Sequence, residues 1–269
     1  MIIDGKQIAE RIYSELTNTI SHLLSAPHMT IITCAPTAAT QTYLTYKTAA
    51  ATRVGVLATI ITLPPDSTTD DCMVAIARAS IQTDGIVVQL PLPKHIDTDI
   101  VINAIPASLD IDGLRYPKAQ TNFLPPVAGA VAEIARTHGV TFRNKQAVVV
   151  GYGRLVGQPC AAYLKASDAT VEVITDTIVG EEARIKAADV LVLGTGQPGL
   201  ITPDMIKDDV MVFDAGTAEV GDRLRGDADP SCAEKASLYT PVPGGIGPIT
   251  IALLLKNCVQ AQNQQPAAA

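Results

Sequence analysis

Three segments that contain glycine directly follow apolar runs. Their composition is typical of phosphate-binding turns. The first, residues 151–157 (GYGRLVG), follows the apolar run 146–150 and precedes a predicted helix. Glycines there let the backbone approach a pyrophosphate, which the free N–H groups of the next helix N-terminus attract. The G-x-G-x-x-x-G spacing is one residue longer than the usual dinucleotide fingerprint, so a strand-to-helix turn that holds no ligand is the alternative.

The arrangement is repeated after two later apolar runs, by residues 194–199 (GTGQPG) and 214–217 (DAGT). Ligands of open α/β sheets bind at the carboxyl ends of the strands, so the repetition predicts a site for NADP or NAD. The predicted cofactor contacts in these segments are Gly151, Tyr152, Gly153, Arg154, Val156, Gly157, Pro159, Gly194, Thr195, Gly196, Ala215, Gly216 and Thr217.

One acidic residue bears on the choice of cofactor. Asp176 lies 25 residues beyond Gly151, just past the second apolar run of this half. A carboxylate at that place can accept hydrogen bonds from the adenosine ribose, which favours NAD over NADP. The alternative is an acid in a surface loop.

Apolar periodicity predicts two successive groups of alternating helices and strands, and hence an α/β fold with parallel sheets. The elements expected in the first half are helices over 5–24, 40–54 and 70–80 and strands over 29–34, 58–64 and 85–91. Those expected in the second half are strands over 146–151, 170–175, 189–194 and 210–216 and a last helix over 248–260.

Composition excludes several classes of protein. The net charge is −7 and the basic residues are scattered, which argues against a nucleic-acid-binding protein. Apolar runs are far shorter than the roughly 20 residues that a membrane span needs. The N-terminus does not resemble a signal peptide, so we expect a cytoplasmic location. The five cysteines and four histidines lack ligand spacing, so we expect reduced thiols and no metal site.

Tyr43 and Lys47 lie four residues apart on one face of a predicted helix, and alone they would be an ordinary surface pair. The surrounding sequence and three further segments add to this pair. The segments 40–47 (TQTYLTYK), 84–93 (DGIVVQLPLP), 110–113 (DIDG) and 240–248 (TPVPGGIGP) follow one another along the chain. Together they resemble the signature segments of the bifunctional methylenetetrahydrofolate dehydrogenase/methenyltetrahydrofolate cyclohydrolase family, across nearly the whole chain.

The resemblance implies a homodimeric enzyme with a folate cleft between its two domains. A βαβ catalytic domain over 1–122, completed by the C-terminal helix over 244–260, would bind folate. A Rossmann-type parallel sheet domain over 123–243 would bind NADP or NAD, and 261–269 would be a disordered tail. The implied activity is oxidation of 5,10-methylenetetrahydrofolate to 5,10-methenyltetrahydrofolate, followed by hydrolysis to 10-formyltetrahydrofolate.

The resemblance also implies roles for four residues. Lys47 matches the family's cyclohydrolase lysine, Tyr43 a tyrosine that stacks on the substrate, Gln89 a glutamine that tunes the lysine, and Asp112 an aspartate that grips the pterin. A lysine sheltered in a cleft can lose its proton near neutral pH and move protons during hydrolysis. The expected substrate contacts are Tyr43, Lys47, Gln89, Leu90, Pro91, Asp112, Pro243, Gly244 and Gly245.

The chain departs from the family pattern in the segment that joins its two halves and in the predicted cofactor site. Residues 124–129 (LPPVAG) stand where a Pro-Cys-Thr-Pro-x-Gly segment is usual, and Gly153 stands where Ser is common. Loss of that hydroxyl and gain of Asp176 weaken the case for binding a 2′-phosphate, although Arg154 can compensate. Two alternatives therefore stay open: a monofunctional cyclohydrolase and a catalytically silent dinucleotide-binding protein.

Overall fold

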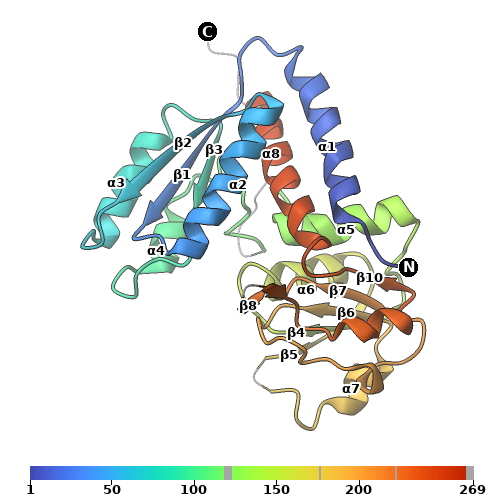
Figure 1. Cartoon of the computed structure of the whole chain (residues 1–269). Coiled ribbons are helices and arrows are strands. Elements are labelled where there is room, and N and C mark those ends of the chain that lie inside the picture. The colour runs from blue at the N-terminus through green and yellow to red at the C-terminus, as the bar shows by residue number, and fades with distance from the viewer. Residues whose placement is uncertain (118–122, 176, 222, 265–269) are drawn as a thin grey trace. The chain divides into compact units, whose positions relative to one another are not determined.

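The computed structural model describes residues 1–117, 123–175, 177–221 and 223–264. The chain divides into two compact units (Figure 1). The small-sheet unit contains Glu10–Pro125 and the chain from Ile251 onward, and the large-sheet unit contains Met1–Ala9 and Pro126–Thr250. Two of the three dividing points fall within helices α1 (Gly5–Ile20) and α8 (Ile246–Gln264), and the third lies between Pro125 and Pro126.

The small sheet contains β1 (His28–Cys34), β2 (Leu57–Leu63) and β3 (Gly85–Val88) in the order β2-β1-β3, all parallel. One face of the sheet packs its apolar side chains on α3 (Thr69–Ala79) and α4 (Thr98–Asn103). Helix α2 (Ala38–Val54) connects β1 to β2. Parallel neighbours require such crossovers, which agrees with the alternation expected from the sequence.

Local residues fix the ends of these helices. The Thr37 hydroxyl accepts a hydrogen bond from the Thr40 amide at the start of α2, and Gly55 ends the helix with φ 89°. A residue without Cβ adopts this left-handed backbone conformation at little cost. Thr68 and Asp71 form a reciprocal capping box at the start of α3. These caps define where α2 begins and ends and where α3 begins.

The large sheet contains β4 (Gln146–Val150), β5 (Thr170–Ile174), β6 (Val190–Leu193), β7 (Met211–Asp214) and β10 (Leu238–Tyr239). Its order is β10-β7-β6-β4-β5, with all neighbours parallel. Helices α5 (Pro126–His138), α6 (Gly157–Ala166) and α7 (Glu182–Ala187) belong to this unit. In chain order the sheet reads 2-1-3-4-5, a doubly wound arrangement whose direction reverses between β4 and β6.

The N-terminal residues extend the large sheet. The Tyr239 amide donates to Met1 O and the Ile3 amide donates to Tyr239 O, both at 2.9 Å, and Ile2 pairs with Tyr239 in parallel. Met1–Ala9 therefore cluster with the large-sheet unit, which differs from the expectation that the other domain would begin at residue 1. The two backbone hydrogen bonds to Tyr239 of β10 account for the difference.

Several elements differ from those expected. Helix α1 ends at Ile20 rather than near residue 24, and β3 ends at Val88, before the Gln89–Pro91 turn. Helix α8 runs to Gln264, into the segment expected to be disordered, and residues 265–269 lie outside the described residues. The additional elements are α4, α5, β10, the hairpin of β8 (Ala218–Val220) and β9 (Arg223–Arg225), and the 3-10 turns Pro203–Met205 and Pro230–Glu234.

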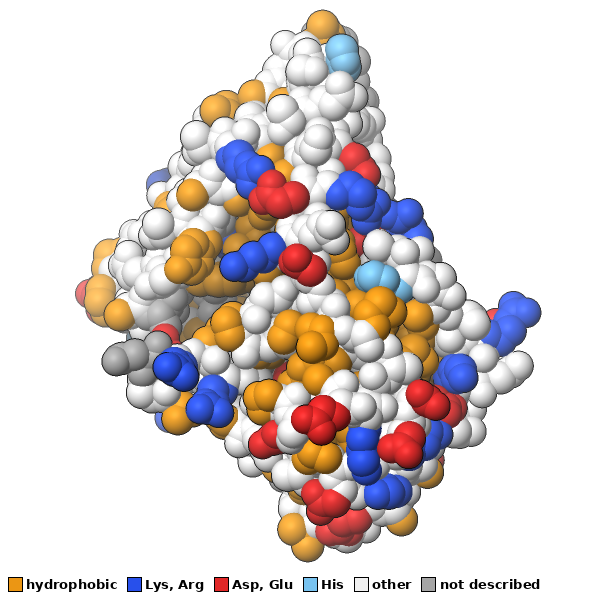
Figure 2. All heavy atoms as spheres, turned by 45° about the vertical axis from the view of Figure 1, so that its right-hand side comes forward, with side chains coloured by type: hydrophobic (Ala, Val, Ile, Leu, Met, Phe, Trp, Pro, Cys, Tyr) orange, Lys and Arg blue, Asp and Glu red, His pale blue; other side chains and the backbone are white. Residues whose placement is uncertain are grey.

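Acidic and basic side chains lie interspersed on the face drawn in Figure 2, as the scattered charges of the sequence indicate. Among the described residues, no helix is both long and apolar enough to span a membrane.

Candidate active site

Lys47 lies on the buried face of α2. Leu44 and Ala51, three residues before it and four after it, are 3% and 0% exposed, and Lys47 itself is only 4% exposed. Residues at this spacing share one helix face, so the lysine occupies a position that an apolar side chain would normally fill. A buried ammonium needs a specific partner.

That partner is Gln89, which follows β3 directly. Lys47 Nζ donates to Gln89 Oε1 at 3.0 Å, while Gln89 Nε2 donates to Leu90 O at 3.0 Å. The second bond fixes which end of the amide faces the lysine. Since the Gln89 backbone amide also bonds Ile32 O of β1, the side chain projects from the carboxyl edge of the small sheet.

Asp112 reaches the same edge of the small sheet from another segment. Asp110, two residues earlier, pairs with Ile86 of β3 in a parallel bridge, so the chain leaves the sheet edge at Asp112. Asp110 is fully buried and its carboxylate accepts from the Leu114 and Arg115 amides at 2.9 and 3.0 Å. It thereby fixes the turn that follows Asp112.

Burial and mutual charge shift the pKa values of these groups. Burial lowers the pKa of the Lys47 ammonium, and the nearby Asp112 carboxylate opposes that change. Burial raises the pKa of Asp112, and Lys47 opposes it. Burial raises the pKa of Asp110 to about 6. The amine of Lys47 is thus available in its neutral, proton-accepting form at lower pH than an exposed lysine.

Tyr43 stands one turn before Lys47 and is 37% exposed. Lys47 Nζ lies 4.9 Å from the centroid of the Tyr43 ring. The ring therefore contacts the cation and keeps an open surface on which a flat molecule can stack. Leu90 and the exposed Pro91 follow Gln89 at the same edge. The structure thus brings together Tyr43, Lys47, Gln89, Leu90, Pro91 and Asp112 within the small-sheet unit.

The predicted contacts Pro243, Gly244 and Gly245 belong to the large-sheet unit, in the turn before α8. The Gly5 amide donates to Gly244 O at 2.9 Å, which attaches this turn to the start of α1.

The glycine segment 151–157 lies at the place where the large sheet reverses direction. It follows β4, which pairs with β5 on one side and β6 on the other. A Cβ on Gly157 would lie 2.0 Å from Gly151 O, and one on Gly151 would lie 2.7 Å from Gly194 O. The close backbone packing therefore requires glycine at both positions. The turn leads into α6, whose N-cap residue, Val156, has no side-chain acceptor for the first helical N–H groups.

Tyr152 and Gly153 of this segment are exposed, whereas Arg154 and Val156 are half-buried and Pro159 is buried. A Cβ at Gly153 would meet nothing within 4 Å, so this glycine is not required by packing. The segments after β6 and β7 place Gly194, Thr195, Gly196, Ala215, Gly216 and Thr217 at the same carboxyl edge of the sheet.

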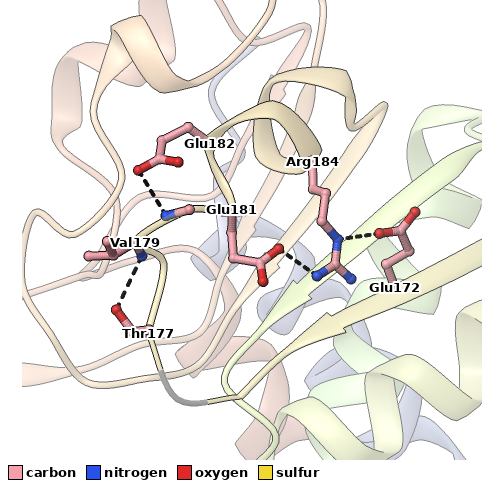
Figure 3. A network of polar contacts seen from close by, with 7 residues as sticks. Glu172, Thr177, Val179, Glu181, Glu182 and Arg184 are labelled. Atoms are coloured by element: carbon pink, nitrogen blue, oxygen red, sulfur yellow. Dashed lines mark hydrogen bonds and ion pairs between the residues drawn. The ribbon is translucent and has the colours of Figure 1, made fainter.

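The segment after β5 is braced by Arg184, whose guanidinium donates to Glu172 of β5 and to Glu181 (Figure 3). In the same network the Gly180 amide donates to Glu182 and the Val179 amide to Thr177. Asp176, the predicted ribose-binding acid, lies outside the described residues.

Comparison with known proteins agrees with both halves of this geometry. Residues 3–112 match the model of the tetrahydrofolate dehydrogenase/cyclohydrolase catalytic domain, and residues 125–266 match that of its NAD(P)-binding domain. The chain belongs to the tetrahydrofolate dehydrogenase/cyclohydrolase family.

Individual relatives of the family match over almost their whole length. A bifunctional protein FolD from Nautilia profundicola is 36% identical, covering 97% of this chain and 96% of the relative. The FolD crystal structure from Campylobacter jejuni has a TM-score of 0.93 at 30% identity, covering 98% and 99% of the two chains. The Trypanosoma brucei enzyme, complexed with NADP cofactor and inhibitor, has a TM-score of 0.92 at 32% identity, covering 100% and 99%.

The predicted family, the two-domain α/β fold and the enzyme class are therefore confirmed. This family member carries an NAD(P)-binding domain. Its large-sheet unit fits a dinucleotide, because the glycine turn lies where the sheet reverses direction and leads into a helix whose N-terminus no side chain caps. Within the described residues, no group of three His, Cys, Asp or Glu side chains is arranged to hold a metal ion.

Sequence reasoning missed three buried polar residues of this family member. Asp214 and Asp227 hold the segments after β6 and β7, and Asn257 of α8 holds the backbone beside Asp112. For the aspartates, the only local indication was the glycine close to each, Gly216 and Gly226.

Proposed function

We propose that the enzyme oxidises 5,10-methylenetetrahydrofolate with NAD(P)⁺ and hydrolyses the resulting 5,10-methenyltetrahydrofolate to 10-formyltetrahydrofolate. The observation that carries this proposal is the buried amine of Lys47, 3.0 Å from Gln89 and beside the exposed ring of Tyr43. Membership of the tetrahydrofolate dehydrogenase/cyclohydrolase family supports both reactions.

In the hydrolysis, Lys47 acts as the proton carrier. Water adds to the carbon that bridges N5 and N10, and the neutral Lys47 amine takes the proton which that water loses. The bond from this carbon to N5 then breaks, and the proton passes from Lys47 to N5. The hydroxyl releases its proton to solvent as the formyl group forms on N10. The lowered pKa of Lys47 keeps neutral amine available for the first step.

The neighbours of Lys47 position the amine and the folate. The Gln89 carbonyl accepts from Nζ and stabilises the ammonium that forms during the reaction. The Tyr43 ring offers a face for stacking, and the Asp112 carboxylate can accept two hydrogen bonds from the aminopyrimidinone edge of the pterin. We assign further substrate contacts to Leu90, Pro91, Pro243, Gly244 and Gly245.

For the oxidation, bound NAD(P)⁺ supplies the hydride acceptor. We assign its pyrophosphate to residues 151–157 and the N-terminus of α6, and its remaining contacts to Pro159, Asp176 and the segments 194–196 and 215–217. The protein's contribution is to bind and orient the two molecules, because an aligned pair reacts far faster than a random one.

Absorbance assays on the purified protein test the proposal. We expect reduction of NAD⁺ or NADP⁺ with 5,10-methylenetetrahydrofolate, and loss of the methenyl absorbance without any dinucleotide. A protein with neither activity would refute the proposed function. Hydrolysis without dehydrogenation would identify a monofunctional cyclohydrolase, and dinucleotide binding without either reaction would identify a silent binding protein.

We also propose that the enzyme is a cytoplasmic homodimer. The location is supported by five cysteines that are all free and buried, as in a reducing compartment. The dimer is supported by β2, an edge strand of the small sheet with Leu57 58% exposed and Ile60 40% exposed. An apolar edge strand is a ready site for pairing with a second copy.

The dimer proposal predicts that Ile60→Lys converts the protein to a monomer, because the charge would have to be buried at the edge. Light scattering after size-exclusion chromatography measures the mass. Val179→Lys, at a 78% exposed apolar position of the large-sheet unit, is the matched control and should leave the mass unchanged. A monomeric wild type would refute the homodimer.

A further inference from the structure

Two buried carboxylates in the large-sheet unit take no part in the proposed chemistry. Asp214 ends β7 and is 1% exposed, and Asp227 follows the β8–β9 hairpin and is 0% exposed. Burying a carboxylate is costly unless hydrogen bonds replace its water. The partners of these two groups therefore indicate what the burial achieves.

Asp227 holds the segment after β6. Its Oδ2 accepts from the Thr195 amide at 2.6 Å and from the Thr195 hydroxyl at 2.8 Å, and its Oδ1 accepts from the Gln197 amide at 2.8 Å. The Thr195 hydroxyl is thus directed at Asp227. One side chain fixes two backbone amides of a segment that the sequence assigns to the dinucleotide.

Asp214 in turn holds Asp227. Asp214 Oδ2 accepts from the Ala228 amide at 2.8 Å, and Oδ1 accepts from the Asp227 and Gly216 amides at 3.2 and 3.0 Å. The Asp214 carboxylate therefore fixes the segment after β7, through Gly216, and the backbone amides of Asp227 and of the residue that follows it. Burial raises the pKa of Asp214 to about 7, with the charge of Asp227 adding to the shift.

Two glycines interlock with this pair. A Cβ on Gly216 would lie 2.1 Å from Asp227 Cγ, and a Cβ on Gly226 would lie 2.2 Å from Asp214 Oδ2. Each carboxyl group fills the space that a side chain would need on the opposite segment. The packing leaves little freedom for the segment after β7 and residues 226–227 to separate.

We propose that Asp227, anchored by Asp214, is a positioning residue that sets the segments 194–197 and 214–217 in their dinucleotide-binding arrangement before the dinucleotide arrives. The inference rests on the proposed function, because it assigns these segments to NAD(P)⁺. Both segments follow strands at the carboxyl edge of the large sheet, and the first of them follows β6, the neighbour of the strand that precedes the 151–157 turn. Holding a site in its bound shape removes an ordering cost from binding and so increases affinity.

Asp227→Asn tests the proposal with nearly unchanged shape. An amide has one accepting end, so either the Thr195 N–H loses its acceptor or the Gln197 N–H keeps only its longer bond, 3.2 Å, to the Thr195 hydroxyl. We expect the Kd for NAD(P)⁺, measured by calorimetry without folate, to rise about tenfold or more. The dehydrogenase KM for the dinucleotide should rise in parallel while kcat at saturation changes much less. Amide exchange at Thr195 and Gln197, slow in the ligand-free wild type, should accelerate.

Asp229→Asn is the matched control. Asp229 stands two residues further on and accepts from Ser231, outside both segments, so its replacement should leave the Kd unchanged. A folded Asp227→Asn protein that binds within twofold of the wild type would overturn the inference. Cyclohydrolase activity, which needs no dinucleotide, reports whether the variant is folded.

A second variant decides the question should Asp227→Asn not fold. Asp214→Asn keeps Asp227 and removes one of the two carboxylate oxygens that accept from the Gly216, Asp227 and Ala228 amides. The Kd should rise severalfold, and a Kd within twofold of the wild-type value would overturn the inference. A wild-type protein that binds neither NAD⁺ nor NADP⁺ would instead refute the proposed function.

Discussion

At the scale of single residues, Lys47 is the group on which the proposed hydrolysis depends. Lys47→Met keeps the length and apolar stem of the side chain and removes the proton-carrying amine. We expect cyclohydrolase kcat/KM to fall by at least about 100-fold, the lower range for loss of a general acid–base group. Stopped absorbance assays with the methenyl substrate measure the change, and circular dichroism checks the fold. Full activity in this variant would remove Lys47 from the mechanism.

The lowered pKa of Lys47 also makes stability depend on pH. In the unfolded chain the lysine has an ordinary pKa of about 10.4. Burial lowers the pKa of Lys47 in the folded protein, which therefore releases the proton at lower pH. Between the two pKa values the unfolded state binds more protons, so the free energy of unfolding rises with pH. Below that window the buried ammonium destabilises the fold.

Lys47→Met should therefore be more stable than the wild type near pH 7, and the difference should shrink toward about pH 10. Urea unfolding of both proteins at several pH values measures this difference. A constant difference across the range would mean that the lysine titrates as it does in water.

The sequence could predict the Tyr43, Lys47, Gln89 and Asp112 group but not the Asp214–Asp227 pair. Long signature segments carry the first four residues, and the spacing of Lys47 from Leu44 and Ala51 is consistent with burial. Asp227, in contrast, bonds residues 30 and 32 positions away. Nothing in local periodicity encodes a contact at that separation.

At the scale of elements, α8 supports the segment that carries Asp112. Asn257 is 8% exposed, and its Nδ2 donates to Ile111 O at 2.8 Å and to Leu124 O at 3.2 Å. Asn257→Leu would leave both carbonyls unpaired, at a cost of about 1–3 kcal/mol in the free energy of unfolding. The folate KM should rise more than kcat falls, because Asp112 would be held less firmly.

Urea unfolding and steady-state kinetics measure both effects of Asn257→Leu. Gln260→Leu, at an exposed position of the same helix, controls for the added apolar side chain. Should both variants unfold at the same urea concentration, Asn257 would have no supporting role.

The same elements show where sequence patterns succeed. The buried strands β1, β4, β6 and β7 consist mostly of apolar and β-branched residues and were predicted to within about two residues, the usual uncertainty of boundaries. Helix α5 was not predicted, although it begins at Pro126 and Pro at the first helical position is typical of a helix start. The exposed β8–β9 hairpin has no apolar alternation from which to predict it.

At the scale of the whole molecule, charge bears on the choice between NAD⁺ and NADP⁺. The chain has a net charge of −7, which disfavours an additional phosphate. Gly153 offers no hydroxyl at a place where packing would admit a side chain, and Asp176 adds a carboxylate at the predicted ribose position. Arg154 is the nearby cation that would favour the 2′-phosphate. On balance we expect NAD⁺ to bind more tightly.

Ligand-linked stability measures that preference for the intact chain. A ligand that binds only the folded state raises the free energy of unfolding by RT ln(1 + [L]/Kd), about 2.7 kcal/mol at 100 times Kd. At equal concentrations NAD⁺ should therefore raise the thermal midpoint more than NADP⁺. Asp176→Ser should narrow or reverse the difference, because it removes a charge that repels the 2′-phosphate. If the variant and the wild type show the same ratio of affinities, Asp176 is a surface acid and Arg154 becomes the residue to replace next.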